Sequence, residues 1–402
     1  MNKVVIIGGG VSGMISAILA STNHSVTILE ANDKCGKKIL LTGNGKCNYW
    51  NQDITIQNYH SSDMDIVKKI ITLENQKEVL DLLANIGIYP KIKNGYYYPY
   101  SNQASSVRNL LLLELERRKV DILYDFKVEE IVKKENGFLI KSKDQEICAD
   151  QVILSTGSKA CPKTGSDGSG YLLAESLGHT IHMISPALVQ LIGKYTCFKE
   201  WDGVRCESKV SLYAGEEKVE EDTGEIQLTD YGISGIVTFN ISGSASYYLA
   251  NNKKVEARIN FVPWLENTFY DFFTNRNQEI PNHTIEELLE SIIPYKLMHV
   301  ILKKASINKD DNWDHLTETK KQTLASYMEN FPLEIVATND YQKAQVCRGG
   351  VSLREINPFT MESTIVPNLY LVGELLDVDG RCGGFNMAFA FISGYLAGRS
   401  VK

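Results

Sequence analysis

Residues 4–13 read VVIIGGGVSG, and this stretch decides the fold of the chain. The apolar run Val4–Ile7 predicts a buried parallel strand, and Met14–Ala20 predicts the helix that follows it. Between them lies a G-x-G-x-x-G motif formed by Gly8, Gly10 and Gly13. Glycine at these points permits a tight turn, lets the backbone approach a pyrophosphate and lets the helix pack close to the strand. The helix N-terminus then offers free N–H groups and a partial positive charge to a diphosphate.

A second apolar run, Val26–Leu29, completes a βαβ unit of about thirty residues, the size of a nucleotide-binding half. Glu30 ends this run. A carboxylate there can accept hydrogen bonds from a ribose diol, and it disfavours a 2′-phosphate. The motif therefore predicts a dinucleotide site, but by itself it does not distinguish NAD from FAD.

A glycine- and lysine-rich loop follows at residues 36–48, GKKILLTGNGKCN. Lys37 and Lys38 supply cations near the dinucleotide. Gly43 and Gly45 allow the backbone to approach a flat ring closely. The same composition is also compatible with a basic surface loop.

The C-terminal segment 369–388 reads LYLVGELLDVDGRCGGFNMA. It predicts a strand that ends at Gly373-Glu374 and a helix that begins near Asn386. The N-terminus of such a helix would stabilise negative charge on the pyrimidine ring of a reduced flavin. Together with the loop, this segment favours a flavin over a free nicotinamide.

The predicted fold class is α/β, a two-part Rossmann-type FAD-binding domain with an inserted β-rich plus helical module. Within the first part, residues 66–86 and 107–118 predict helices, and residues 121–147 predict an antiparallel meander. We expect four segments: 1–187 and 342–402 as the two parts of the FAD-binding domain, 188–265 as an inserted β-rich subdomain and 266–341 as an inserted helical subdomain.

Composition narrows the class of partner. The 402 residues carry a formal net charge of −7, which argues against nucleic acid, since that partner favours a basic face. The eight cysteines form no C-x-x-C pair, so we expect reduced thiols and no metal site. Neither a signal peptide nor a membrane span is visible, so we expect a cytoplasmic protein with no membrane partner. The oligomeric state stays open.

Seven blocks of the sequence carry a family resemblance. They are GGGVSG (8–13), GKKILLTGNGKCN (36–48), GYYYPYSNQASSV (95–107), VILSTGSKACPKTGSDGSGYLLAESLGHTI (152–181), PALVQL (186–191), LTDYGISG (228–235) and RGGVSLREINPFTMESTIVPNLYLVGELLDVDGRCGGFNMAFAFISGYLAG (348–398). In these blocks the chain resembles the aminoacetone-oxidase-like flavoproteins, also described as BaiN-type or YhiN-type oxidoreductases.

The resemblance implies FAD bound without a covalent link by residues from both ends of the chain. The residues that match the family's cofactor site are Gly8, Gly10, Val11, Ser12 and Gly13 for the diphosphate, Glu30 for the adenosine ribose, Lys38, Thr42, Gly43, Gly45, Cys47 and Asn48 along the flavin, Val128 at the adenine, Thr156 and Gly157 after a strand, and Gly373, Glu374, Asp379, Gly384, Asn386 and Met387 at the ribityl chain and pyrimidine ring. The sequence departs from the family at Asn44 and Lys46, and its aromatic-Pro element is Tyr98-Pro99.

No catalytic triad or carboxylate pair is needed, because a flavin carries the chemistry and the protein positions it. The candidate catalytic residues are Lys46, Cys47, Asn48, Tyr98, Tyr100 and Asn386. Cys47 is more consistent with packing than with redox chemistry, and Tyr98 or Tyr100 could line an apolar pocket or donate a proton to an enolate. No second G-x-G-x-x-G follows a strand, so NADH or NADPH would bind only transiently over the exposed ring.

These observations predict an FAD-dependent oxidoreductase acting on a small organic substrate. The favoured branch is a reductase in which NAD(P)H reduces the flavin and hydride passes from N5 to an activated double bond, as in an enone or steroid. The alternative is an amine (aminoacetone-like) oxidase that uses oxygen. An alternative of another class is a flavin-binding RNA-modifying or regulatory protein.

Overall fold

The computed structural model describes residues 2–194 and 198–402 and divides the chain into two compact units. One unit is built from Met1–Ile184 and Gln345–Lys402, and the other is Ser185–Ala344. The first unit is therefore assembled from both ends of the chain. Cys197, one of the eight cysteines, lies outside the described residues.

A parallel sheet forms the centre of the first unit, with the strand order β20-β11-β1-β2-β7. Its strands are β1 (Lys3–Ile7), β2 (Ser25–Leu29), β7 (Asp121–Leu123), β11 (Gln151–Leu154) and β20 (Leu369–Leu371). Helix α1 (Val11–Ala20) links β1 to β2, as the opening motif predicts. The central strands are buried because they are covered on both faces, which explains their unbroken apolar sequences.

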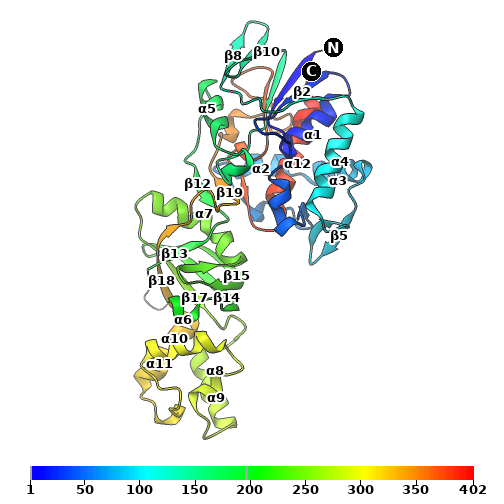
Figure 1. The fold of residues 1–402 in the computed structure, drawn as a ribbon. Helices are drawn as coiled ribbons and strands as arrows, with labels where there is room; N and C mark the ends of the chain where they lie inside the picture. The colour runs from blue at the N-terminus through cyan, green and yellow to red at the C-terminus, as the bar shows by residue number, and fades with distance from the viewer. Residues whose placement is uncertain (1, 195–197) are drawn as a thin grey trace. The chain divides into compact units, whose positions relative to one another are not determined.

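Helix α12 (Phe385–Ser400) packs against α1, and Figure 1 shows the two lying side by side, in red and blue. The contact is close because glycines face serines. A Cβ on Gly394 would lie 2.5 Å from the Ser12 carbonyl oxygen, and one on Gly398 would lie 2.6 Å from that of Ser16. The Ser16 hydroxyl also donates to the Gly394 carbonyl at 2.9 Å. These contacts bring the two ends of the sequence together.

Further helices and small sheets complete the first unit. The helices are α2 (Met64–Ile70), α3 (Leu73–Ile86), α4 (Ala104–Arg117) and α5 (Ser169–Ser176). One small sheet has the order β3-β6-β5 and consists of β3 (Trp50–Asn51), β5 (Pro90–Lys93) and β6 (Tyr96–Pro99). A second has the order β10-β9-β8 and consists of β8 (Glu130–Lys134), β9 (Gly137–Lys141) and β10 (Glu146–Ala149). A third pairs β21 (Asp379–Gly380) with β4 (Tyr59–His60).

Two predictions for this unit need correction. The single helix predicted over residues 66–86 is two helices, because the Thr72 hydroxyl accepts from the backbone of Asn75 and starts α3 afresh. The meander predicted over residues 121–147 begins only at β8, since β7 instead pairs in parallel with β2.

The second unit contains a closed barrel with the order β13-β16-β15-β14-β17-β18. Its strands are β13 (Leu191–Gly193), β14 (Arg205–Ala214), β15 (Glu217–Leu228), β16 (Gly232–Ser234), β17 (Val255–Asn260) and β18 (Phe331–Thr338). Its helices are α6 (Phe198–Trp201), α7 (Ile236–Ala250), α8 (Phe269–Glu279), α9 (Ile285–Leu289), α10 (Tyr295–Ala305) and α11 (Glu318–Glu329).

Strand β18 contradicts a purely helical assignment of residues 266–341. Phe331, Leu333 and Ile335 alternate with more exposed residues and are buried in the core of this unit. This period of two is the signature of a strand with one buried face. The strand pairs with β13 and β17 and closes the barrel.

Candidate functional site

The glycine turn after β1 contains two glycines that the packing of the protein requires. Gly8 has φ +104°, and a Cβ there would lie 2.5 Å from the Ser155 carbonyl oxygen. A Cβ on Gly13 would overlap the Gly8 carbonyl oxygen and lie 2.5 Å from the Ser155 hydroxyl. These two positions hold the turn and α1 against β11.

Gly10 is different, because nothing in the described protein lies within 4 Å of a Cβ at this position. Its backbone is extended (φ −76°, ψ −177°), a conformation that any residue adopts. The protein's own packing and backbone therefore do not explain this glycine, and the space beside it is open for a ligand.

The N-terminus of α1 is not capped. No side chain caps Gly10, and within residues 2–194 and 198–402 the N–H groups of Val11, Ser12 and Gly13 have no hydrogen-bond acceptor. Free N–H groups and the positive end of the helix dipole together make an anion site. This arrangement fits a diphosphate.

Glu30 lies at the carboxyl end of β2, and its side chain is buried. One carboxylate oxygen accepts from the Gly9 N–H at 2.8 Å, and the other accepts from the backbone and side-chain nitrogens of Asn32 at 2.8 and 2.7 Å. Its position after β2 is the one at which a carboxylate accepts from a ribose diol in Rossmann-type sites.

Val128 lies two residues after Phe126, whose backbone N–H donates to the Glu30 carbonyl at 2.9 Å. In the part of the chain that the structure describes, the backbone groups of Val128 make no hydrogen bond. A contact between these backbone groups and an adenine ring stays a prediction.

The loop at residues 36–48 contains left-handed backbone at Gly43, Asn44, Gly45 and Cys47. The Cys47 thiol is buried and lies 3.7 Å from the sulfur of Met387. Burial raises the pKa of this thiol to about 11, so it is protonated at neutral pH. A neutral, buried thiol fits packing better than nucleophilic or redox chemistry.

Three segments converge on one carboxylate in the first unit. The Lys38 ammonium from the loop pairs with Glu374 at 2.5 Å, and the Ser158 hydroxyl donates to the same carboxylate oxygen at 3.1 Å. The contact ties the loop to the segments that follow β11 and β20. Lys38 and Glu374, far apart in sequence, are therefore brought together.

Thr156 and Gly157 follow β11 directly. The Thr156 hydroxyl oxygen is buried, and among the described residues it has no hydrogen-bond partner. Gly157 has φ +75°, and a Cβ there would lie 2.7 Å from the Ser166 hydroxyl. The turn is thus a tight exit from the sheet at the same edge as the glycine turn.

The turn after β20 reaches the opening motif. Gly373 has φ +71°, and a Cβ there would lie 2.5 Å from the Ser12 hydroxyl oxygen. Farther on, Gly384 precedes α12 with φ +93° and packs against the Trp50 carbonyl, 2.6 Å from a Cβ. Within the described ranges, no side chain caps α12, so this helix also presents an open N-terminus.

Asp379 and Asn386 hold this turn together. The buried Asp379 carboxylate accepts from Arg348 at 3.1 and 3.2 Å. Burial acts to raise the pKa of Asp379, but the charges of Arg348 and His60 outweigh it and hold the pKa below its usual range. The Asn386 amide accepts from the Gly380 N–H at 2.8 Å and donates to its carbonyl at 2.7 Å. A contact of either side chain with a cofactor stays a prediction.

The other candidate catalytic residues do not form one cluster. Tyr98 packs on the loop, since its ring lies 3.6 Å from a Cβ on Gly43. Tyr100 is 72% exposed, and Lys46 is exposed. With its amide nitrogen turned toward them, Asn48 donates to the carbonyls of Tyr97 and Trp50 and supports the loop.

Sequence reasoning missed several residues of this site. Ser158, Asn32 and Arg348 each fix a predicted residue, namely Glu374, Glu30 and Asp379. Asn32, two residues after Glu30, is a short-range partner that a local pattern could have indicated. Arg348 and Ser158 are remote in sequence, and no local pattern indicates them.

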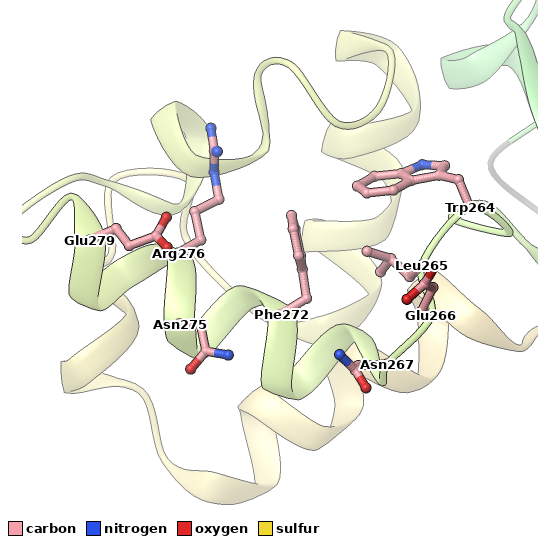
Figure 2. A pocket seen from close by; sticks show the side chains of 8 residues that line it. All are labelled: Trp264, Leu265, Glu266, Asn267, Phe272, Asn275, Arg276 and Glu279. Atoms are coloured by element: carbon pink, nitrogen blue, oxygen red, sulfur yellow. The ribbon is translucent and has the colours of Figure 1, made fainter.

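A pocket of about 400 Å³ lies in the second unit. Figure 2 shows Trp264 and Phe272 among the side chains that line it, with ring centroids 5.5 Å apart. None of the predicted site residues lines this pocket. Among the residues that the structure describes, no cluster of three or more His, Cys, Asp or Glu side chains is arranged to hold a metal, and no helix is long and apolar enough to cross a membrane.

The donors and acceptors of the first unit fit a dinucleotide such as FAD. The first N–H groups of α1 are free, a Cβ on Gly10 would meet open space, and Glu30 lies at the end of the next strand. Both features stand at the carboxyl edge of a parallel sheet, where ligands bind in open α/β folds.

Comparisons with known proteins agree with this arrangement. Residues 2–400 match the family described as the HI0933-like protein Rossmann domain. The chain is 42% identical to the 3-dehydro-bile acid delta(4,6)-reductase of Clostridium scindens, over 100% of this chain and 99% of that protein. It is 26% identical to the ribosomal RNA dihydrouridine synthase of Haemophilus influenzae, over 99% of this chain and 98% of that protein.

Among solved structures, the open conformation of a flavocytochrome c3 fumarate reductase matches with a TM-score of 0.51 and 14% identity, over 100% of this chain and 78% of that chain. At this identity the match concerns the fold alone, and it confirms the predicted α/β class. Because the family match spans nearly every residue and a relative is 42% identical over the full length, the chain belongs to the HI0933-like family, the flavoprotein oxidoreductases that its motifs predict.

Proposed function

We propose that the protein binds one FAD in its first unit and reduces a carbon–carbon double bond conjugated to a carbonyl in a small, steroid-like molecule. The observation that carries the cofactor is the open N-terminus of α1 beside Gly10, next to the buried carboxylate of Glu30. The 42% identical reductase supports the reaction. The electron donor in this proposal is NADH or NADPH.

The chain's own residues would divide the binding task. The N–H groups of Val11, Ser12 and Gly13 would hold the diphosphate, and Glu30 would accept from the adenosine ribose. The open N-terminus of α12 would stabilise negative charge at the far end of the cofactor. Bound there, FAD would supply two-electron hydride transfer between a nicotinamide donor and the substrate.

The names of the relatives point to one type of bond. A 3-dehydro-bile acid with delta(4,6) unsaturation and the uracil ring of a uridine both contain a carbon–carbon double bond conjugated to a carbonyl. Such a bond accepts hydride at the carbon remote from the carbonyl and a proton at the adjacent carbon, so the substrate gains two hydrogens. We infer that this chain acts on the same type of bond.

The proton needs a donor near the loop. We assign this role to Tyr98, whose ring packs against Gly43 and whose phenol can donate a proton. Burial raises the pKa of this phenol. Replacing Tyr98 with Phe should lower the turnover number about 10²-fold while FAD stays bound, since general acid catalysis contributes factors of this order. Tyr100→Phe, on an exposed side chain, is the matched control.

An anaerobic stopped-flow experiment tests the function. The FAD-loaded enzyme is mixed with NADH or NADPH, then with a 3-oxo steroid that contains 4,6 double bonds. We expect the flavin absorbance to bleach with the nicotinamide and to return with the enone, and the product to gain 2 mass units of hydrogen per bond reduced. Bleaching by an amine alone, followed by reoxidation only with oxygen, would favour an oxidase instead.

A second candidate is reduction of a uridine in RNA, which the 26% identical relative favours. The net charge of −7 argues against a large RNA partner, because RNA binding depends on basic contacts to phosphate. Incubation of the reduced enzyme with unmodified ribosomal RNA, followed by nucleoside mass spectrometry, separates the two. Appearance of dihydrouridine without enone reduction would establish the second candidate.

A further inference from the structure

The hairpin of β5 and β6 carries two lysines and two tyrosines on one face. In its antiparallel register Lys91 lies opposite Tyr98, and Lys93 lies opposite Tyr96. Residues directly opposite each other in such a pair project to the same side of the sheet. We refer to Lys91, Lys93, Tyr96 and Tyr98 as the lysine–tyrosine face.

The tyrosines of this face pack on the loop at residues 36–48 and on the turn before α12, two segments that carry residues predicted to contact the cofactor. The Tyr98 ring lies 3.6 Å from a Cβ on Gly43 of the loop, and the Tyr96 ring lies 2.6 Å from a Cβ on Gly383, two residues before α12. Strand β5 is the outer strand of its sheet, and both of its lysines are exposed. The face thus runs from the cofactor segments outward to two lysines.

The charge around this face is positive and uncompensated. Residues 34–52 and 82–113 contain no Asp or Glu, although the chain as a whole has a net charge of −7. Lys38 pairs with Glu374, but in the described part of the chain Lys46, Lys91 and Lys93 form no ion pair. An uncompensated cationic region beside a candidate active site attracts anionic substrates.

We propose that the lysine–tyrosine face is the subsite for a flat, apolar substrate that ends in a carboxylate, of the bile-acid type. The apolar body would lie along Tyr96 and Tyr98, and the carboxylate would reach Lys91 and Lys93. Tyrosine offers a large apolar surface with a polar tip, and lysine places a compact charge on a flexible stem. This inference rests on the proposed function and adds the feature that selects among enones.

A small anion explains this face better than RNA does. Lys91 and Lys93 lie on the outer strand opposite Tyr98 and Tyr96, so the positive charge of the face is confined to its outer edge and suits one carboxylate attached to an apolar body. A nucleic-acid site instead follows the phosphate backbone with a longer row of cations, each contact adding to its salt dependence.

Binding titrations of the FAD-loaded protein test the inference. The probes are a 3-oxo-4,6-dienoic bile acid with a free carboxylate and its uncharged methyl ester. The test variant is Lys91→Ala/Lys93→Ala. The matched control is Lys68→Ala/Lys69→Ala, which removes two exposed lysines from α2 in the same unit. We expect the test variant to bind the acid about tenfold more weakly, as two exposed charge contacts would allow, and to bind the ester unchanged.

The wild-type preference for the acid should shrink as salt is raised to about 0.5 M, because exposed charges are screened. Equal binding of acid and ester by the wild type and by both variants, with both probes still reduced, would overturn the subsite and leave the proposed function intact. Failure to bind or reduce either probe would instead remove the proposed function. Loss of binding to a single-stranded RNA oligonucleotide in the test variant, without loss of acid binding, would assign the face to RNA.

Discussion

Replacing Gly10 with Val should weaken FAD binding without destabilising the protein. A Cβ there would meet no atom of the described protein within 4 Å, and the extended backbone suits valine. Loss of a favourable glycine N-cap is offset by the reduced entropy of the unfolded chain, so the stability of the FAD-free protein should change by less than about 1 kcal/mol. The same side chain would collide with a diphosphate at the end of α1. Overpacking costs about 1–3 kcal/mol, which is about 5- to 150-fold in the dissociation constant.

The assay is equilibrium dialysis of the FAD-free protein against FAD, paired with urea unfolding of the same samples. Gly13→Ala is the contrasting variant, because its Cβ would overlap the Gly8 carbonyl and the protein itself must shift. That variant should lose about 1–3 kcal/mol of unfolding free energy even without FAD. If Gly10→Val bound FAD as tightly as the wild type, the diphosphate would not lie at this turn.

Three further outcomes follow from side chains in the first unit. Glu30→Ala should lower the unfolding free energy of the FAD-free protein by about 2–4 kcal/mol, because it leaves the backbone donors of Gly9 and Asn32 without an acceptor. Urea titration measures this change, and a loss below roughly 0.5 kcal/mol, the range of ordinary surface substitutions, would contradict it. Iodoacetamide at about pH 8 should alkylate the exposed Cys148 but spare Cys47, because the Cys47 thiol is buried and its pKa is raised to about 11. Peptide mass spectrometry measures the labelling of both sites, and equal labelling would show that Cys47 is not a buried, protonated thiol. The pKa of Asp379 is lower in the folded protein than in the unfolded chain, where an Asp titrates near about pH 4. The pairing of Asp379 with Arg348 therefore stabilises the folded protein above about pH 4, and this stabilisation is lost as the pH falls through the lower pKa of the folded state. The stability advantage of the wild type over Asp379→Asn, measured by urea unfolding, should therefore shrink as the pH falls below about 4, and an advantage that grew there would contradict this sign.

The βαβ unit could be predicted from sequence because its determinants are local. Gly8 and Gly13 are required by contacts with the adjoining strands, so their spacing carries the geometry of the turn directly. The barrel was harder to predict, since β18 pairs with β13 and β17 across a long helical stretch. Its alternating Phe331, Leu333 and Ile335 gave a usable signal, but their pairing partners depend on tertiary contacts.

The site was predictable as a set of backbone positions and much less so as a set of side-chain roles. Asp379 and Asn386 match the family by position, yet in the structure Arg348 and Gly380 occupy their polar atoms. The partner of Lys38 is a carboxylate 336 positions away. Such long-range pairs depend on the folded arrangement, so the sequence pattern around each residue alone does not reveal them.

The most direct test of the cofactor site is a crystal structure of the protein grown or soaked with FAD. We expect a single FAD in the first unit, with its diphosphate at the N–H groups of Val11, Ser12 and Gly13 and its adenosine ribose at Glu30. FAD bound elsewhere, or a protein that takes up no FAD while its α1 turn stays as described, would contradict the central claim.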